Sequence, residues 1–86
     1  MKKREIREIV AQLRHELRRA EDIDPDARKW TEELHREVTD LAEGSGGDVE
    51  GLADRARALE TRFAARHPTL ETVARELADA LAKMGV

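Results

Sequence analysis

The fold is decided by the stretch Phe63-Ala-Ala-Arg-His-Pro-Thr-Leu-Glu-Thr-Val-Ala-Arg-Glu-Leu-Ala-Asp-Ala-Leu-Ala-Lys-Met-Gly-Val86, which is the most regularly hydrophobic part of the chain. Large apolar residues recur there at helical spacing, and alanines widen the stripe on both sides; its large members are Leu70, Val73, Leu77, Leu81 and Met84. A stripe of this width indicates packing against more than one neighbouring helix, so we expect the rest of the chain to supply those neighbours.

His67 and Pro68 mark the start of this helix. Proline has no backbone N–H donor and a pre-set φ, which suits the first turn of a helix and not its interior. We therefore predict a helix over 68–84 and a structural role for His67 at the junction before it. A pH-sensitive contact or a ligand role for His67 is the alternative.

The same stretch resembles a known family. The run His67-Pro68-Thr69-Leu70, followed by Leu77-Ala-Asp-Ala-Leu-Ala-Lys-Met-Gly-Val86, is similar to the C-terminal signature of a small bacterial family catalogued as domain of unknown function 4404. An amphipathic helix over 6–19 and the break Ile23-Asp-Pro-Asp26 resemble the family's N-terminal half, whereas Ser45-Gly-Gly47 departs mildly from its pattern. The resemblance covers nearly the whole chain and implies a short all-helical bacterial protein, but it supplies no activity.

Three further helices are predicted from apolar residues that alternate at spacings of three and four. With the helix over 68–84, they cover about 3–21, 25–43 and 48–66, and the glycine-rich segment 44–47 is predicted as a flexible linker. Asp24 and Pro25 are typical of an N-cap followed by the first helical residue. The inward positions include Leu13 and Leu17, then Ala27, Trp30, Leu34, Val38 and Leu41, and finally Phe63.

These elements predict a single all-α domain over 1–86, built as a short helical bundle of four amphipathic segments. The apolar spacing continues in phase through both prolines, so two long proline-kinked helices in an antiparallel hairpin are the alternative. We favour four helices because both Pro25 and Pro68 follow plausible caps.

The chain is small for a protein with a single core. Of its 86 residues, 40% are hydrophobic, but 13 of these are alanine and only 21 are larger apolar residues. Such a core barely offsets the conformational entropy lost on folding. We therefore expect the bundle to be completed by oligomerisation, with coiled-coil-like packing of its apolar stripes.

Composition and charge also indicate where the protein is located and how its segments pair. The chain has no cysteine, and no run of apolar residues approaches the ~18 needed for a membrane span. The N-terminus lacks the apolar core of a secretion signal, and a cytoplasmic location is expected. Residues 1–20 carry a net charge of +4 and residues 21–43 carry −6, so these segments should attract each other.

The sequence gives little support for a catalytic site or a metal site. Glu32-x-x-His35 has the spacing of a di-iron ligand pair in helix bundles, but at 100° per residue Glu32 lies nearly opposite the apolar stripe, so a solvated face explains the pair better. His15 is expected at the surface, and Ser45, the single serine, falls in the linker. We expect no catalytic residue, no metal, no cofactor and no small-molecule substrate.

The leading hypothesis is a non-enzymatic helical module for protein–protein interaction or self-assembly, whose partner is a second copy or another helix. The residues expected to form its core or contact surface are Leu13, Leu17, Trp30, Leu34, Phe63, Leu77 and Leu81. The rival hypothesis is a peripheral protein that binds an acidic membrane surface or nucleic acid through Lys2, Lys3, Arg4, Arg7, Arg14 and Arg18. We rank it lower because Glu5, Glu8 and Glu16 interrupt the basic segment.

Overall fold

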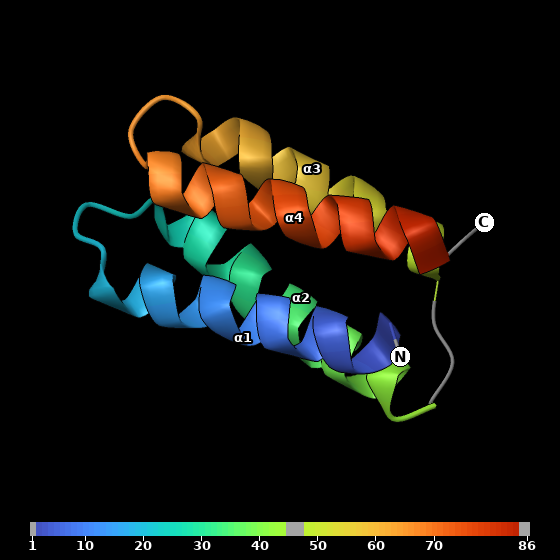
Figure 1. Cartoon of the computed structure of the whole chain (residues 1–86). Helices are drawn as coiled ribbons and strands as arrows, with labels where there is room; N and C mark the ends of the chain where they lie inside the picture. Colours follow the sequence, from blue (N-terminus) through green and yellow to red (C-terminus); the bar gives the residue numbers. More distant parts are fainter. Residues whose placement is uncertain (1, 45–47, 85–86) are drawn as a thin grey trace.

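Four α-helices form over residues 2–44 and 48–84, which are the residues that the computed structural model describes. They are α1 (Lys2–Arg19), α2 (Pro25–Ala42), α3 (Val49–Phe63) and α4 (Pro68–Met84). Successive helices run antiparallel, so the start of α1 and the end of α4 lie at the same end of the molecule (Figure 1). No strand occurs within these two ranges.

Each helix packs against two neighbours in a bundle of 34 × 19 × 19 Å. α1 contacts α2 and α4, and α3 contacts the same two helices from the other side. The pair α3–α4 packs most extensively and the pair α2–α3 least. The prediction of an all-α bundle of four amphipathic segments is therefore confirmed.

Two breaks in the helices separate this bundle from the alternative of two long kinked helices. After α1, Asp22 adopts a left-handed backbone with φ 57°, a conformation in which aspartate is enriched, and the chain reverses there. Asp24 then caps α2 by accepting a hydrogen bond from the backbone N–H of Asp26 at 3.2 Å, and Pro25 opens the helix. The chain therefore starts a new helix at Pro25.

The second break shortens α3. We expected this helix to reach about residue 66, but it ends at Phe63. His67 precedes a proline, and steric contact with the proline ring disfavours helical backbone there. The backbone N–H of His67 instead donates to the Phe63 carbonyl at 2.8 Å and closes the turn, and Pro68 begins α4.

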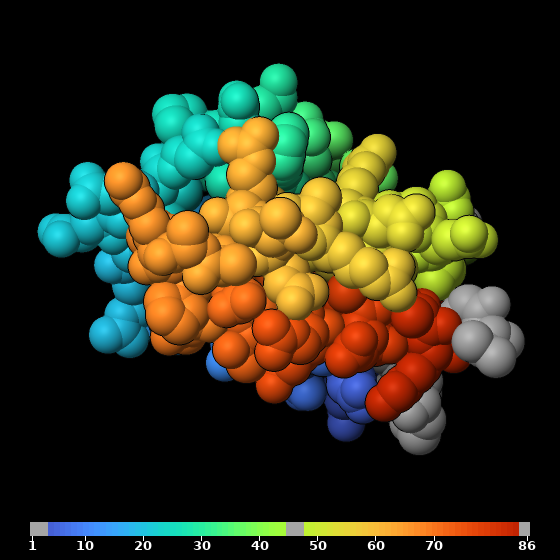
Figure 2. Space-filling model, turned by 90° about the horizontal axis from the view of Figure 1, so that it is seen from above, coloured from blue at the N-terminus to red at the C-terminus, as the bar shows by residue number. Residues whose placement is uncertain are grey.

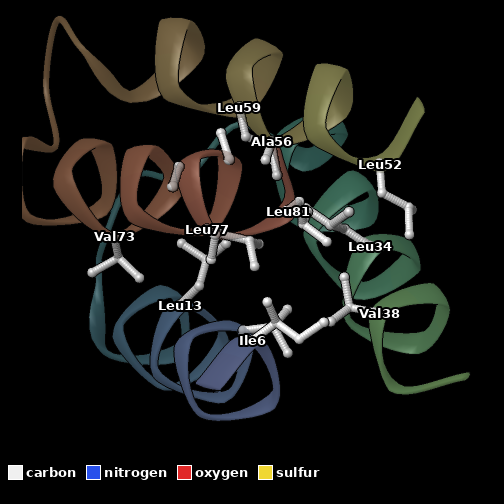
Figure 3. Close-up of a cluster of buried hydrophobic side chains, with 14 of the residues drawn as sticks. Ile6, Leu13, Leu34, Val38, Leu52, Ala56, Leu59, Val73, Leu77 and Leu81 are labelled. Carbon is white, nitrogen blue, oxygen red and sulfur yellow. The ribbon is translucent and has the colours of Figure 1, made fainter. Parts of the chain in front are cut away.

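One continuous core runs along the bundle axis. Side chains from all four helices meet there, as the labelled residues in Figure 3 show. Leu13, Leu34, Leu77 and Leu81 are fully buried. Alanines occupy much of the remaining interior, with Ala27, Ala53, Ala56, Ala74, Ala78 and Ala80 all buried. Alanine lets helices approach closely, so this small set of large side chains suffices to fill the interior of one chain.

The end of α2 and the start of α3 each have a typical local feature. Gly44 lies just past α2 with φ +84°, which glycine adopts without strain. Asp48 caps α3 by accepting a hydrogen bond from the backbone N–H of Gly51 at 3.0 Å. The predicted flexible linker, apart from Gly44, lies outside the described residues.

Within the described residues, none of the helices is both long enough and apolar enough to pass through a membrane.

Candidate interaction face

The residues selected from the sequence divide into core and surface. Leu13, Leu17, Leu34, Phe63, Leu77 and Leu81 are at most 2% exposed within the single chain. Their side chains are therefore used inside the bundle, and another chain could reach them only if the bundle opened. Trp30 is 38% exposed and is the one exposed large hydrophobic residue of the described chain.

The inward position that we assigned to Trp30 belongs to Thr31. The buried stripe of α2 is Ala27, Thr31, Leu34, Val38 and Leu41, which keeps alternating spacings of four and three. At 100° of rotation per residue, Trp30 lies about 60° from the centre of that stripe, at its edge. Thr31 is fully buried and satisfies its hydroxyl by donating to the Ala27 carbonyl at 2.9 Å. The periodicity alone could have identified this shift, because Trp30 breaks the alternation and Thr31 keeps it.

Trp30 lies on the side of α2 that faces α3. The guanidinium of Arg62, near the end of α3, lies 4.4 Å from the centroid of the Trp30 ring. Arg62 also donates a hydrogen bond to the carboxylate of Asp24, the cap of α2. A cation over an indole face is attracted by the ring quadrupole, so Arg62 both holds the ring in place and links α2 to α3.

A shallow hollow of about 270 Å³ adjoins this tryptophan. Its lining comes from Trp30 and Glu33 of α2 and from Arg55, Ala58 and Leu59 of α3. Leu59 is buried and forms the floor, whereas Ala58 is exposed on the rim. The hollow lies along the pair of helices that pack least extensively. In the view of Figure 2, side chains of α3 reach over α2 along this boundary.

Opposite charges lie on the two helices that border the hollow. The α2 side carries Glu33 and Glu37, and the α3 side carries Arg55 and Arg62. Arg55 donates a hydrogen bond to the Glu37 carboxylate, which spans the boundary between the helices. This surface combines an exposed aromatic ring, an apolar floor, and one acidic and one basic row. We call it the α2–α3 face, and its residues are Trp30, Glu33 and Glu37 together with Arg55, Ala58 and Arg62.

The Glu32–His35 pair faces α1. Arg14 of α1 lies 3.2 Å from the Glu32 carboxylate, so Glu32 is engaged in an ion pair between helices. The pKa of His35 is lowered, first by burial and then by the positive charges of Arg14 and Arg18, with Glu32 opposing them. Among the described residues, no group of three histidine, aspartate or glutamate side chains is placed to hold a metal ion.

The basic residues of the rival hypothesis lie in different surroundings along α1. Arg14 is paired with Glu32 on α2. Arg4 and Arg7 line a hollow of about 440 Å³ with Glu8, Ala11 and Ala42, so an acid lies among them. Arg18 is exposed, and the side chains of Lys2 and Lys3 lie outside the described residues.

The two junctions meet at one end of the bundle. A hollow of about 510 Å³ is lined by residues from both, including Asp22, Asp24 and His67. A second hollow, of about 370 Å³, contains Pro68 and His67. The His67 ring packs edge-on against Phe63, with centroids 6.2 Å apart, and the His67 carbonyl accepts a hydrogen bond from the Glu71 N–H at 2.9 Å as α4 begins. These contacts give His67 a structural place between α3 and α4.

Comparison with known proteins identifies the family. Neither a curated protein nor a solved structure matches the chain. A family model does match, over residues 6–86, and its description is domain of unknown function (DUF4404). The match spans the buried stripes of all four helices and both proline junctions, and the chain belongs to this family.

Proposed function

We propose that this protein is a non-enzymatic helical interaction module that associates with another helical protein surface through its α2–α3 face. The observation that carries the proposal is Trp30. Exposing part of an indole is unfavourable, and tryptophan and arginine are the residues enriched where binding energy concentrates in interfaces. Here the exposed ring lies against Arg62 and adjoins a hollow with Leu59 as its floor and Arg55 in its lining.

The chemistry of the face defines its partner. A helix presenting an apolar ridge would cover Leu59, Ala58 and the edge of Trp30, as in helix-in-groove recognition. Charged residues beside such a ridge would meet the acidic row on one side and the basic row on the other. A second copy of this chain and a helix of another protein both satisfy this description. The cytoplasmic location expected from the sequence and the bacterial origin implied by the family resemblance both stay predictions.

A photo-crosslinking amino acid at position 58 tests the proposal in the cells that make the protein. Ala58 is exposed beside the hollow, and Ala11 is an equally small, exposed alanine on α1 that serves as the matched control position. We expect irradiation to give one discrete adduct from position 58 and none from position 11. The crosslinked protein is then identified by mass and purified, and it should bind the wild type more tightly than Trp30→Ala.

Two results would overturn the proposal. One is equal crosslinking from positions 58 and 11, which would indicate chance collisions. The other is an identified partner whose purified form binds Trp30→Ala as tightly as the wild type. A crosslink between two copies of this chain counts in favour, because self-association is one form of the proposed activity.

The alternative function is binding to an acidic membrane surface or to nucleic acid through α1. It is supported by Arg4 and Arg7, which are exposed together near the start of that helix. It is weakened by the engagement of Arg14 with Glu32. Binding to acidic liposomes or to DNA that is lost in Arg4→Ala/Arg7→Ala, and weakened by added salt, would favour this alternative.

A further inference from the structure

We infer that the partner of the α2–α3 face is a second copy of the same chain, related by a twofold axis that runs parallel to the helices, so that α2 of each copy lies on α3 of the other. This inference rests on the proposed function and narrows it to one partner and one orientation. The reason is the separation of charge on the face: acids lie on α2, and arginines lie on α3.

The acidic row on α2 and the basic row on α3 determine which twofold axis is favourable. Two identical faces can meet about a twofold axis parallel to the helices or perpendicular to them within the interface plane. The perpendicular axis would place α2 on α2 and bring Glu33 and Glu37 of both copies together, which like-charge repulsion disfavours. The parallel axis places the acidic row of each copy on the basic row of the other. Such an interface is isologous and closed, which stops association at two copies.

The parallel axis also aligns the individual contacts, because it leaves every residue at its own height along the bundle. Glu37 and Arg55 lie at one height, since they are hydrogen-bonded to each other. In the dimer these two residues and their copies form a network of four alternating charges. Trp30 and Arg62 also share a height, so Trp30 of the second copy lies against Arg62 and the adjoining Ala58–Leu59 floor. Each hollow is thus completed by an aromatic ring that the other copy contributes.

The size of the face sets the strength of the association. The apolar part of the face is confined to Trp30, Ala58 and Leu59, so we expect the dimer to bury less than the roughly 800 Å² per partner of a standard-sized interface. Its edges are charged and remain in contact with water. We therefore expect a reversible dimer with a dissociation constant in the micromolar range.

A charge-swap experiment tests the orientation. The variant Glu37→Arg/Arg55→Glu keeps an ion pair within each chain and also restores complementarity between two swapped chains. A mixed dimer with one wild-type chain would instead place base against base and acid against acid across the interface. Because the swap leaves the composition and mass unchanged, one protein is labelled with ¹⁵N and the mixture is analysed by native mass spectrometry.

We expect dimers in each pure sample and a mixed dimer well below its statistical share. A mixed dimer above that share would overturn the inference, because only α2-on-α2 packing makes mixing favourable. A wild type that stays monomeric throughout the micromolar range would also overturn it. That second result leaves the proposed function standing if the crosslink from position 58 leads to a different protein, so the two failures are distinguishable.

A steric variant provides a second measurement, and it replaces no member of the ion pairs Arg55–Glu37 and Arg62–Asp24 within the chain. Ala58→Glu adds a charged side chain at the rim of the hollow, and Ala11→Glu makes the same change on α1. Sedimentation equilibrium should show the dissociation constant raised about tenfold or more by Ala58→Glu and nearly unchanged by Ala11→Glu. Circular dichroism verifies that both variants are folded. Equal effects of the two substitutions would contradict the assigned face.

Discussion

Replacing Leu77 with alanine removes three carbon atoms from the centre of the core. Leu77 is 0% exposed, and it points into the same interior space as Leu13 and Leu81 (Figure 3). The transfer term alone, at about 0.8 kcal/mol per carbon, amounts to about 2.4 kcal/mol. α4 packs against both α3 and α1, so it cannot move far to fill the space, and a cavity term adds to the loss. We expect the free energy of unfolding to fall by about 3–4 kcal/mol.

Urea denaturation followed by circular dichroism measures this change at a fixed protein concentration. The midpoint should fall while the dependence of the unfolding free energy on urea stays constant, and the melting temperature should drop by roughly 12–32 °C. Glu76→Ala is the matched control, since Glu76 precedes Leu77 on the same helix and is exposed. It should change stability by less than about 0.5 kcal/mol. A loss below about 1 kcal/mol for Leu77→Ala would refute the burial of this side chain.

Three further outcomes are expected from the local contacts. Thr31→Val should leave stability unchanged or raise it by up to about 1 kcal/mol in a thermal melt, because the hydroxyl's partner, the Ala27 carbonyl, keeps its bond within the helix. Gly51→Ala should gain less than the roughly 1 kcal/mol of helix propensity, because its added carbon would lie 2.5 Å from the carboxylate of Asp48, the cap of α3. Stability should decline as the pH falls below 6.5, since the pKa of His35 is lowered by folding and the unfolded chain then binds more protons.

For each of these three predictions, one result would contradict it. A loss above about 1 kcal/mol in Thr31→Val would mean that the hydroxyl has a role beyond its intrahelical bond. If Gly51→Ala raises stability by the full helix-propensity difference of about 1 kcal/mol, the Asp48 cap contributes little to stability. For the pH dependence, urea titrations between about pH 7.5 and 5.5 compare His35→Gln with His15→Gln, whose parent side chain is exposed. If only His35→Gln makes the free energy of unfolding less dependent on pH, His35 is the group responsible for the loss of stability. If neither variant does, that explanation is wrong.

Periodicity was sufficient to predict the bundle. The alternating spacing of apolar residues defined all four helices, and the prolines located the starts of α2 and α4. The left-handed backbone of Asp22 and the early end of α3 were missed, because both depend on how the chain turns between helices. The contribution of alanine was also underestimated. Counting large side chains treats alanine as neutral, whereas the buried alanines allow the close approach that fills this core.

The α2–α3 face was less accessible to sequence reasoning. Trp30 was assigned an inward position, which is wrong because it is 38% exposed, and its role at a contact surface stays a prediction. Its neighbours in the face come from α3, between 25 and 32 residues further along the chain, and their proximity depends on which helices are adjacent in the bundle. The separation of acids and arginines into two rows becomes visible only when α2 and α3 are laid side by side.

The four helices of one chain close its core, and a second copy is the proposed occupant of the α2–α3 face. Trp30 reports on this face directly, since it is the single tryptophan and the chain has no tyrosine. Its emission and its quenching by acrylamide can be followed from nanomolar to high micromolar protein. We expect the emission to shift to shorter wavelength and the quenching to fall as concentration rises, because the second copy covers the ring, while the helical signal stays constant. The unchanging emission of a solvent-exposed indole across that range would contradict it.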